Sequence, residues 1–507
     1  MFADQNRRLP PFTSFLRVKM SQSSQPLLGK SSKIIIVGAG VFGLSTALHL
    51  SRCGYSNVDV YDKQPHDQNN YANSEGADAA SADENKILRA SYGDARLYQD
   101  LAFKAMPEWD HWNRVLAETP DDDLPPSLNP TVKLWDNCGF LRLSGNGLEK
   151  SEVLTQRNFP TELAHTQYRV IDPQRRSDAQ ASGIPFSKID PFDRLERKLP
   201  TDGILDTTAG YVLASRACTF ALRLCKLAGV HFHLGEPHAL KSIMYDTDQT
   251  RATGILTAAG ERHVADLLII ACGGWTPSLL PTRVSQLLET TSGSVLSIRI
   301  PHDRPDLRER FSPANFPVWS WNMGSYERTG EDVGGIYGLP RTPEGVVKIA
   351  FRGAKWTNYT FTDPESGETL SYPKTDVDEV PEEAMRVLRA FTAENMPELL
   401  DLELEKGRLC WYTDSVDNNF LIDRVPGVEN VIVASGGSGH GFKFLPVLGE
   451  HVVDVVEGKD TSYTRMFAWR DVPTGRSNGL EEGPEGWRVL GKQRMVGKRA
   501  WKRGSAL

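Results

Sequence analysis

Apolar and polar positions follow two distinct patterns along the chain. In the first, a β-branched apolar strand over 34–37 leads into a segment with apolar residues at helical spacing, and a second strand is expected over 58–61. This strand–helix pattern returns at 209–235, is followed by a buried strand at 267–272, and reappears between 407 and 458. It predicts an α/β unit built on buried, parallel strands.

The second pattern occupies residues 292 to about 404, where strands predominate. Short segments there alternate or are β-branched, and Gly and Pro bound them, so they predict a mostly antiparallel sheet in a separate domain. An amphipathic helix is expected over 382–394. The strands expected in this sheet and before it are 133–143, 168–171, 295–300, 318–322, 335–339 and 346–351.

A glycine-rich turn joins the first strand to its helix. Gly38, Gly40 and Gly43 form the spacing G-x-G-x-x-G. In a dinucleotide site these glycines permit a tight turn, a close approach of the backbone to pyrophosphate, and close helix–strand packing. Asp62 ends the second strand, where a carboxylate can accept hydrogen bonds from a ribose. The stretch predicts a bound dinucleotide but does not distinguish NAD from FAD.

Composition excludes several classes of function. The 507 residues carry a net charge of −7, which gives no reason to expect a nucleic-acid partner. No apolar run reaches the ~20 residues that a membrane helix needs. The six cysteines have neither metal-site spacing nor the density of a disulfide scaffold, which favours a reducing compartment and predicts no metal site.

Both ends of the chain allow more than one interpretation. Residues 1–31 are basic and lack apolar periodicity, which indicates a disordered extension, with a mitochondrial transit segment or a start at Met20 as alternatives. Ser505-Ala506-Leu507 resembles a peroxisomal address except at Ala506. We expect a cytoplasmic or peroxisomal protein, and we expect the tail after Asp460 to lie on the surface rather than in a core.

Several stretches together carry a family resemblance. They are IIIVGAGVFGLSTALHL, NKILRASYGDARLY, IIACGGWT, IYGLP, VVKIAF and the block CWYT…FLIDR…SGHGFKF, spread over residues 32–460. The chain resembles the flavin-dependent amine oxidases that include monomeric sarcosine, pipecolate, saccharopine and fructosyl amino acid oxidases, within the D-amino acid oxidase-like superfamily.

The resemblance implies an α/β fold with a Rossmann-like FAD-binding domain and an α+β substrate domain on a mostly antiparallel sheet. On this basis we expect three FAD-binding segments, 32–110, 205–285 and 405–460, and two substrate-domain segments, 111–204 and 286–404. The remaining segments are the N-terminal extension, 1–31, and the C-terminal tail, 461–507.

The resemblance also implies roles for individual residues. Cys410 matches the cysteine that forms a thioether to FAD, and Lys348 matches the lysine that promotes reaction with oxygen. Arg89 and Lys443 match cations that hold a substrate carboxylate. Tyr337 and Tyr412 match tyrosines of the substrate cavity. The cofactor-binding residues expected besides the first glycines, Asp62, Cys410 and Lys443 are Phe42, Lys63, Gly273, Trp275, Gly439, His440 and Gly441.

Two positions depart from the sarcosine oxidase pattern. Lys86 stands in place of an arginine, and Arg352 replaces an active-site histidine. A buried Arg352 needs an anionic or oxygen-rich partner, either a protein acid or the substrate. Lys86 and Arg89, three residues apart, would face the same side of a helical turn, where they could hold an anionic substrate or form a solvated basic face.

Without the resemblance, three of these residues have a simpler interpretation. Cys410 would be a buried strand cysteine, Lys348 an exposed edge lysine, and His440 a cap of the helix expected to begin near Phe444. With it, the expected function is FAD-dependent oxidation of a C–N bond in a secondary, cyclic or N-substituted amino acid by oxygen, giving an imine and hydrogen peroxide.

Two alternatives remain open. One is a biosynthetic amine oxidase whose imine cyclises in a natural-product pathway, and the other is a non-oxidase electron-transfer flavoprotein. The expected partners are a small amine and oxygen, without nucleic acid or membrane, and the expected state is a monomer.

Overall fold

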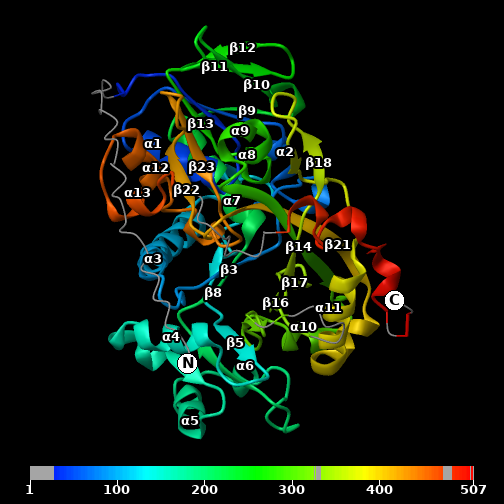
Figure 1. Cartoon of the computed structure of the whole chain (residues 1–507). Coiled ribbons are helices and arrows are strands. Elements are labelled where there is room, and N and C mark those ends of the chain that lie inside the picture. The colour runs from blue at the N-terminus through cyan, green and yellow to red at the C-terminus, as the bar shows by residue number, and fades with distance from the viewer. Residues whose placement is uncertain (1–27, 325, 327–332, 472–481, 503, 506–507) are drawn as a thin grey trace, which may run out of the picture.

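Two large sheets organise the chain in the computed structural model, which describes residues 28–324, 326, 333–471, 482–502 and 504–505 (Figure 1). The six-stranded sheet has the order β22-β23-β13-β1-β2-β9 and is parallel except for the β22–β23 pair. Its strands are β1 (Ile34–Val37), β2 (Val58–Asp62), β9 (His231–Leu234), β13 (Leu267–Ile270), β22 (Leu421–Arg424) and β23 (Val431–Ser435).

Both faces of the six-stranded sheet are covered, which explains why β1 is apolar at every position. One face packs against helices α1 (Val41–Arg52), α3 (Arg96–Glu118), α7 (Ala214–Leu227) and α12 (Gly449–Val456). The other face packs toward a small sheet of β10 (Leu240–Tyr245), β11 (Ala252–Thr257) and β12 (Arg262–Val264). Strands buried on both faces read as continuous apolar runs.

The second sheet has eight strands in the order β21-β14-β17-β16-β15-β5-β7-β6, antiparallel except for the β15–β5 pair. The helices around it include α4 (Lys150–Asn158), α5 (Pro173–Ala181), α10 (Pro305–Arg310) and α11 (Glu382–Asn395). The strands are β5 (Phe140–Ser144), β6 (Gln167–Arg169), β7 (Asp202–Asp206), β14 (Leu288–Arg299), β15 (Val318–Trp321), β16 (Ile336–Leu339), β17 (Val346–Trp356) and β21 (Leu404–Ser415).

The strand β21 corrects one predicted domain boundary. Residues 405–460 are predicted to belong to the FAD-binding domain, but β21 pairs with β14 from Leu288↔Ser415 to Ile298↔Leu404 in the eight-stranded sheet. The cofactor-domain pattern resumes only at β22. Cys410 and Tyr412 therefore come from the edge strand of the eight-stranded sheet.

Two predicted helical segments are also wrong. Lys86 and Arg89 do not share a helical turn, because β3 (Lys86–Leu88) pairs with β8 (Gly210–Val212) in a three-stranded sheet completed by β4 (Trp135–Asp136). Near Phe444 the chain forms only a short 3₁₀ turn, and α12 begins at Gly449. At the first place, pairing with the distant strand β8 overrides the local pattern.

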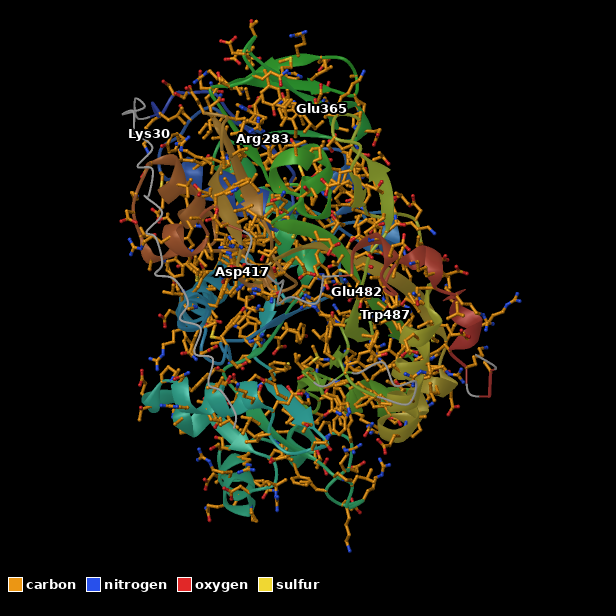
Figure 2. All side chains as sticks on the ribbon, viewed as in Figure 1. Lys30, Arg283, Glu365, Asp417, Glu482 and Trp487 are labelled. Carbon is orange, nitrogen blue, oxygen red and sulfur yellow. The ribbon has the colours of Figure 1, made fainter. Side chains whose placement is uncertain are left out.

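The C-terminal segment is a core element, contrary to the prediction. Its strand β24 (Met495–Val496) pairs with β20 (Val380–Pro381), and Trp501 is fully buried with Nε1 donating to the Leu399 carbonyl at 3.1 Å. Trp487 and Glu482 lie together on this segment, where the Trp487 N–H donates to the Glu482 carboxylate at 3.1 Å (Figure 2).

The predictions at the two ends of the chain fall mostly outside the described residues, which begin at 28 and omit 506–507. The first charged side chain of the described part is Lys30, whose Nζ lies 2.7 Å from Glu457 after α12 (Figure 2). In the described ranges no helix is both long and apolar enough to cross a bilayer.

Candidate functional site

Close packing fixes the glycines that follow β1. Gly38 has φ +106°, and a Cβ there would lie 2.4 Å from the Ala271 carbonyl oxygen. A Cβ on Gly43 would lie 1.7 Å from the carbonyl oxygen of Gly38. Since real Cβ atoms do not approach backbone this closely, both positions require glycine, and the N-terminus of α1 stays open to a ligand.

A glycine-lined cavity of about 280 Å³ surrounds this turn. Asp62 lies in it at the end of β2, with Oδ2 accepting from the Ala39 N–H at 2.7 Å and Oδ1 from the Gln64 N–H at 2.8 Å. Its carboxylate thus also holds the glycine turn in place. The predicted cofactor residues that line this cavity are Gly38, Gly40, Phe42, Asp62, Lys63, Gly273, Trp275, Cys410, Gly439 and Gly441.

Two further features of this cavity bear on cofactor binding. The Lys63 ammonium lies 4.2 Å from the centre of the Trp275 ring, so a predicted residue directly after β2 meets one in the 3₁₀ turn after β13. Ser81 was not predicted, yet its Oγ accepts from the Val41 N–H at 3.1 Å, at the N-terminus of α1. Ser81 lies in the polar stretch of small residues over 64–84, between the second strand of the glycine-turn unit and Lys86, and this composition was the available signal.

A central cavity of about 410 Å³ lies beside the glycine-lined cavity. It is lined by all seven residues predicted to be catalytic, Lys348 for its role with oxygen among them, and by His440. Five residues line both cavities, so the two meet at a common wall: Lys86, Cys410, Tyr412, Gly439 and Phe442. The seven predicted residues are Lys86, Arg89, Tyr337, Lys348, Arg352, Tyr412 and Lys443.

The residues around the two cavities fit FAD. The glycine turn and the N-terminus of α1 provide backbone N–H groups for a pyrophosphate, and Asp62 provides an acceptor for a ribose. Cys410, 7% exposed, lies on the common wall, with its Sγ 3.6 Å from the Lys86 ammonium. A redox ring that binds between a nucleotide site and a substrate cavity would lie against such a wall.

Two cations, the half-buried Arg89 and the buried Lys443, line one side of the central cavity. The Arg89 guanidinium lies 4.4 Å from the centre of the Tyr92 ring, and Lys443 Nζ donates to the Tyr92 hydroxyl at 3.0 Å and to the His440 carbonyl at 2.7 Å. Within the described residues neither cation forms an ion pair with an acid. Burial, and then Arg89 and Arg352, hold the pKa of Lys443 well below its ordinary value.

Lys348 is neither exposed nor at a sheet edge, because β17 lies between β14 and β16 and the side chain is 1% exposed. Its Nζ lies 2.9 Å from the buried carboxylate of Asp83 and donates to the Asn85 carbonyl. Lys86 and Arg408 lie 2.6 and 3.0 Å from the same carboxylate. Although burial alone would raise the pKa of Asp83, these three cations hold it well below its ordinary range.

Asp83 and Arg408 were not predicted. Asp83 is 265 residues before Lys348, and sequence spacing gives no sign of the pair. The only available signals were weak, namely the position of Asp83 three residues before Lys86 and of Arg408 two residues before Cys410 on the same strand.

Of the two partners expected for Arg352, a protein acid or the substrate, the fold provides a protein acid. One guanidinium nitrogen donates to the Ser438 carbonyl at 2.8 Å and lies 3.8 Å from the fully buried Asp414. The guanidinium also lies 5.2 Å from the centre of the Tyr412 ring. Asp414 also lies 3.2 Å from the Lys355 ammonium, so one carboxylate faces both cations.

Comparison with known proteins extends over most of the chain. The profile of the family described as FAD dependent oxidoreductase matches residues 33–455. The chain is 26% identical over 455 residues to L-saccharopine oxidase of Schizosaccharomyces pombe, covering 87% of this chain and 93% of that protein. It is 24% identical over 437 residues to monomeric sarcosine oxidase of a Bacillus species, covering 85% and 94%.

Solved structures give the same result for the fold. Fructosyl peptide oxidase from E. terrenum superposes with a TM-score of 0.72 at 22% identity, over 92% of this chain and 98% of that one. Fructosyl amine:oxygen oxidoreductase (Amadoriase I) from Aspergillus fumigatus gives 0.67 at 25% identity, over 87% and 90%. The predicted combination of a Rossmann-like domain with a second, mostly antiparallel domain is confirmed.

Proposed function

We propose that this chain, which belongs to the FAD dependent oxidoreductase family as its sequence resemblance predicted, oxidises a C–N bond of a secondary, cyclic or N-substituted amino acid with oxygen as acceptor. The observation that carries the proposal is the pair Arg89 and Lys443, one half-buried and one buried cation, neither of which has an acid partner among the described residues. They line the cavity that Cys410 separates from the nucleotide site. A substrate carboxylate would supply the missing negative charge.

FAD would be held by the glycine turn, Asp62 and the Lys63–Trp275 pair, with a covalent bond through Cys410. When bound, FAD supplies the acceptor for the two electrons that leave the C–N bond and passes them to oxygen. The remaining catalytic contribution comes from placement of charge by the protein. We assign no side-chain base, because an amine that binds in its free form needs none.

Arg89 and Lys443 would bind the carboxylate and thereby orient the amine, while Tyr337 and Tyr412 wall the cavity. Lys348 would place a positive charge where negative charge develops on oxygen. Asp83 holds Lys348, Lys86 and Arg408 together, so we propose that it positions these cations below the common wall.

A substrate screen tests the proposed activity. Purified protein carrying FAD should release peroxide with one or more of sarcosine, pipecolate, saccharopine, fructosyl lysine and N-methyl-tryptophan. The same amine without its carboxylate should be a poor substrate, and Arg89→Gln should raise KM more than it lowers kcat. Bound FAD without peroxide from any carboxylated amine would instead favour an electron-transfer flavoprotein.

The depressed pKa of Lys443 predicts a pH dependence of substrate binding. A bound carboxylate favours the protonated ammonium, so binding raises that pKa and takes up a proton. Affinity should be highest at low pH and should fall by about tenfold per pH unit above the pKa of Lys443 in the free enzyme. Calorimetry with a non-oxidisable alkylthioacetate, in buffers of different ionisation enthalpy, measures both affinity and proton uptake.

Lys443→Arg is the matched control, because arginine stays charged at every accessible pH. This variant should bind the inhibitor with little pH dependence and without proton uptake. A wild-type affinity that is constant with pH would contradict the assignment of Lys443 to the carboxylate.

A further inference from the structure

A second group of polar side chains lines the central cavity, and its strands are distant from the strand of Cys410. Arg142 lies on β5 and Asp202 on β7, whereas Cys410 lies on β21, five strands from β5 in the sheet order. Glu149 and Glu152, from α4 and the residue before it, line the same part of the cavity. The volume of about 410 Å³ falls in the range of pockets that hold ligands larger than a minimal amino acid.

Arg142 is the buried donor of this set. The residue is 6% exposed, and its Nε donates to the Glu152 carboxylate at 2.5 Å. Its Nη1 lies 3.6 Å from the Asp206 carboxylate, beyond hydrogen-bond distance, and neither Nη1 nor Nη2 has a hydrogen-bond partner among the described residues. Buried N–H groups left without acceptors are costly, so this side of the guanidinium is suited to a ligand oxygen.

The charges around Arg142 decide which kind of oxygen fits. Glu152 and the fully buried Asp206 place two carboxylates against one guanidinium. A ligand carboxylate at Nη1 and Nη2 would meet both of them in a low-dielectric site, where like charges repel strongly. A hydroxyl or an amide carbonyl accepts the same hydrogen bonds without adding charge.

Two further observations connect this set to the substrate. Burial lowers the pKa of Arg89, and the charge of Arg142 lowers it further, so the two guanidinium groups are within electrostatic reach. The hydroxyl of Ser91, 5% exposed and without a hydrogen-bond partner among the described residues, lines the same cavity. A ligand reaching from Arg89 toward Arg142 therefore meets further hydrogen-bonding capacity.

We infer that Arg142, flanked by Glu152 and Asp206, forms a subsite for an uncharged oxygen-bearing group at the end of the substrate remote from its carboxylate. The inference rests on the proposed amine oxidase function. It assigns as substrates amino acids whose nitrogen substituent ends in a hydroxyl or an amide, and it disfavours substituents that end in a second carboxylate.

Length-matched alkylthioacetates provide an experiment that does not depend on turnover. In these compounds sulfur replaces the oxidisable nitrogen, and the alkyl chain, of graded length, ends in methyl, hydroxyl, amide or carboxylate. Calorimetry with the FAD-containing protein should show that at one chain length the hydroxyl and amide bind about 10- to 100-fold more tightly than the methyl compound. The carboxylate compound should bind no better than methyl.

Two variants test the assignment to Arg142. Arg142→Gln should remove the preference for hydroxyl and amide, while binding of the shortest methyl compound stays near that of wild type. Glu152→Gln keeps the arginine and removes one flanking charge, so it should improve binding of the carboxylate compound selectively. Arg175→Gln, on α5 and outside the lining of both cavities, is the matched control and should leave all affinities unchanged.

The outcomes separate this inference from the proposed function. If N-alkylglycines are oxidised but no chain length shows a preference for hydroxyl over methyl, the subsite is wrong and the amine oxidase assignment stands. The same conclusion follows if the preference survives Arg142→Gln. If Arg142→Gln does not fold, Glu152→Gln tests the subsite instead. A selective gain in affinity for the carboxylate compound in that variant supports the inference, and the absence of such a gain overturns it.

Discussion

Replacing Lys348 with methionine should slow the oxygen-dependent half of turnover by about 10²–10³-fold, the cost typical of removing one group that stabilises developing negative charge. The side chain keeps most of its length but loses the ammonium, which is 1% exposed and lies 2.9 Å from Asp83. Asp83 retains Lys86 and Arg408, so its charge remains compensated and the fold should survive.

Stopped-flow absorbance can measure the two half-reactions, reduction by the amine and reoxidation by oxygen, separately. Anaerobic bleaching of the FAD-containing enzyme by an amine substrate should stay near the wild-type rate, while recovery on mixing with oxygen should slow. Lys241→Met, an exposed lysine on β10, is the matched control and should change neither. Slow bleaching with unaffected recovery would assign Lys348 to substrate binding instead.

Replacing Cys410 with alanine should convert the cofactor from permanently attached to releasable. Cys410 is buried on the wall shared by the two cavities and is the only cysteine of the described residues that lines both. After acid precipitation, wild-type protein should retain yellow colour and in-gel fluorescence, and the Cys410→Ala supernatant should contain the FAD. Noncovalent contacts from the glycine turn and Asp62 remain, so the variant should still bind FAD before denaturation.

The exposed Cys53 provides the control for this experiment, since Cys53→Ala should keep FAD attached. Free FAD in the supernatant of acid-precipitated wild-type protein would show that no thioether forms. Retention of FAD by Cys410→Ala would point to attachment through another side chain.

Local rules account for the part of the fold that the sequence predicted well. The β1–α1–β2 unit follows from a β-branched run, a glycine turn and helical spacing, all within residues 34–62. The site residues carried by the family motifs also converge, since those predicted to contact substrate line one cavity. Their roles stay predictions until the experiments above are done.

Most of the missed features depend on contacts between distant segments. Lys86 reads as helical from its neighbours, but β3 is set by pairing with Gly210–Val212. Asp83 lies in a loop with no periodicity, and only the fold brings it to Lys348 and Arg408. Arg142 lies on a short apolar strand, where its partner Glu152 is visible only once α4 is placed.

Burial of Trp501 imposes an order on biosynthesis. This residue completes the core beneath α11 and β21, and the strand at Met495–Val496 pairs with residues more than a hundred positions earlier. A chain emerging from the ribosome can assemble the β1–α1–β2 unit early, but the eight-stranded sheet lacks part of its core until residues 495–501 have also emerged. Chains that have not yet been synthesised as far as Trp501 therefore expose apolar surface on the substrate side, which chaperones can recognise.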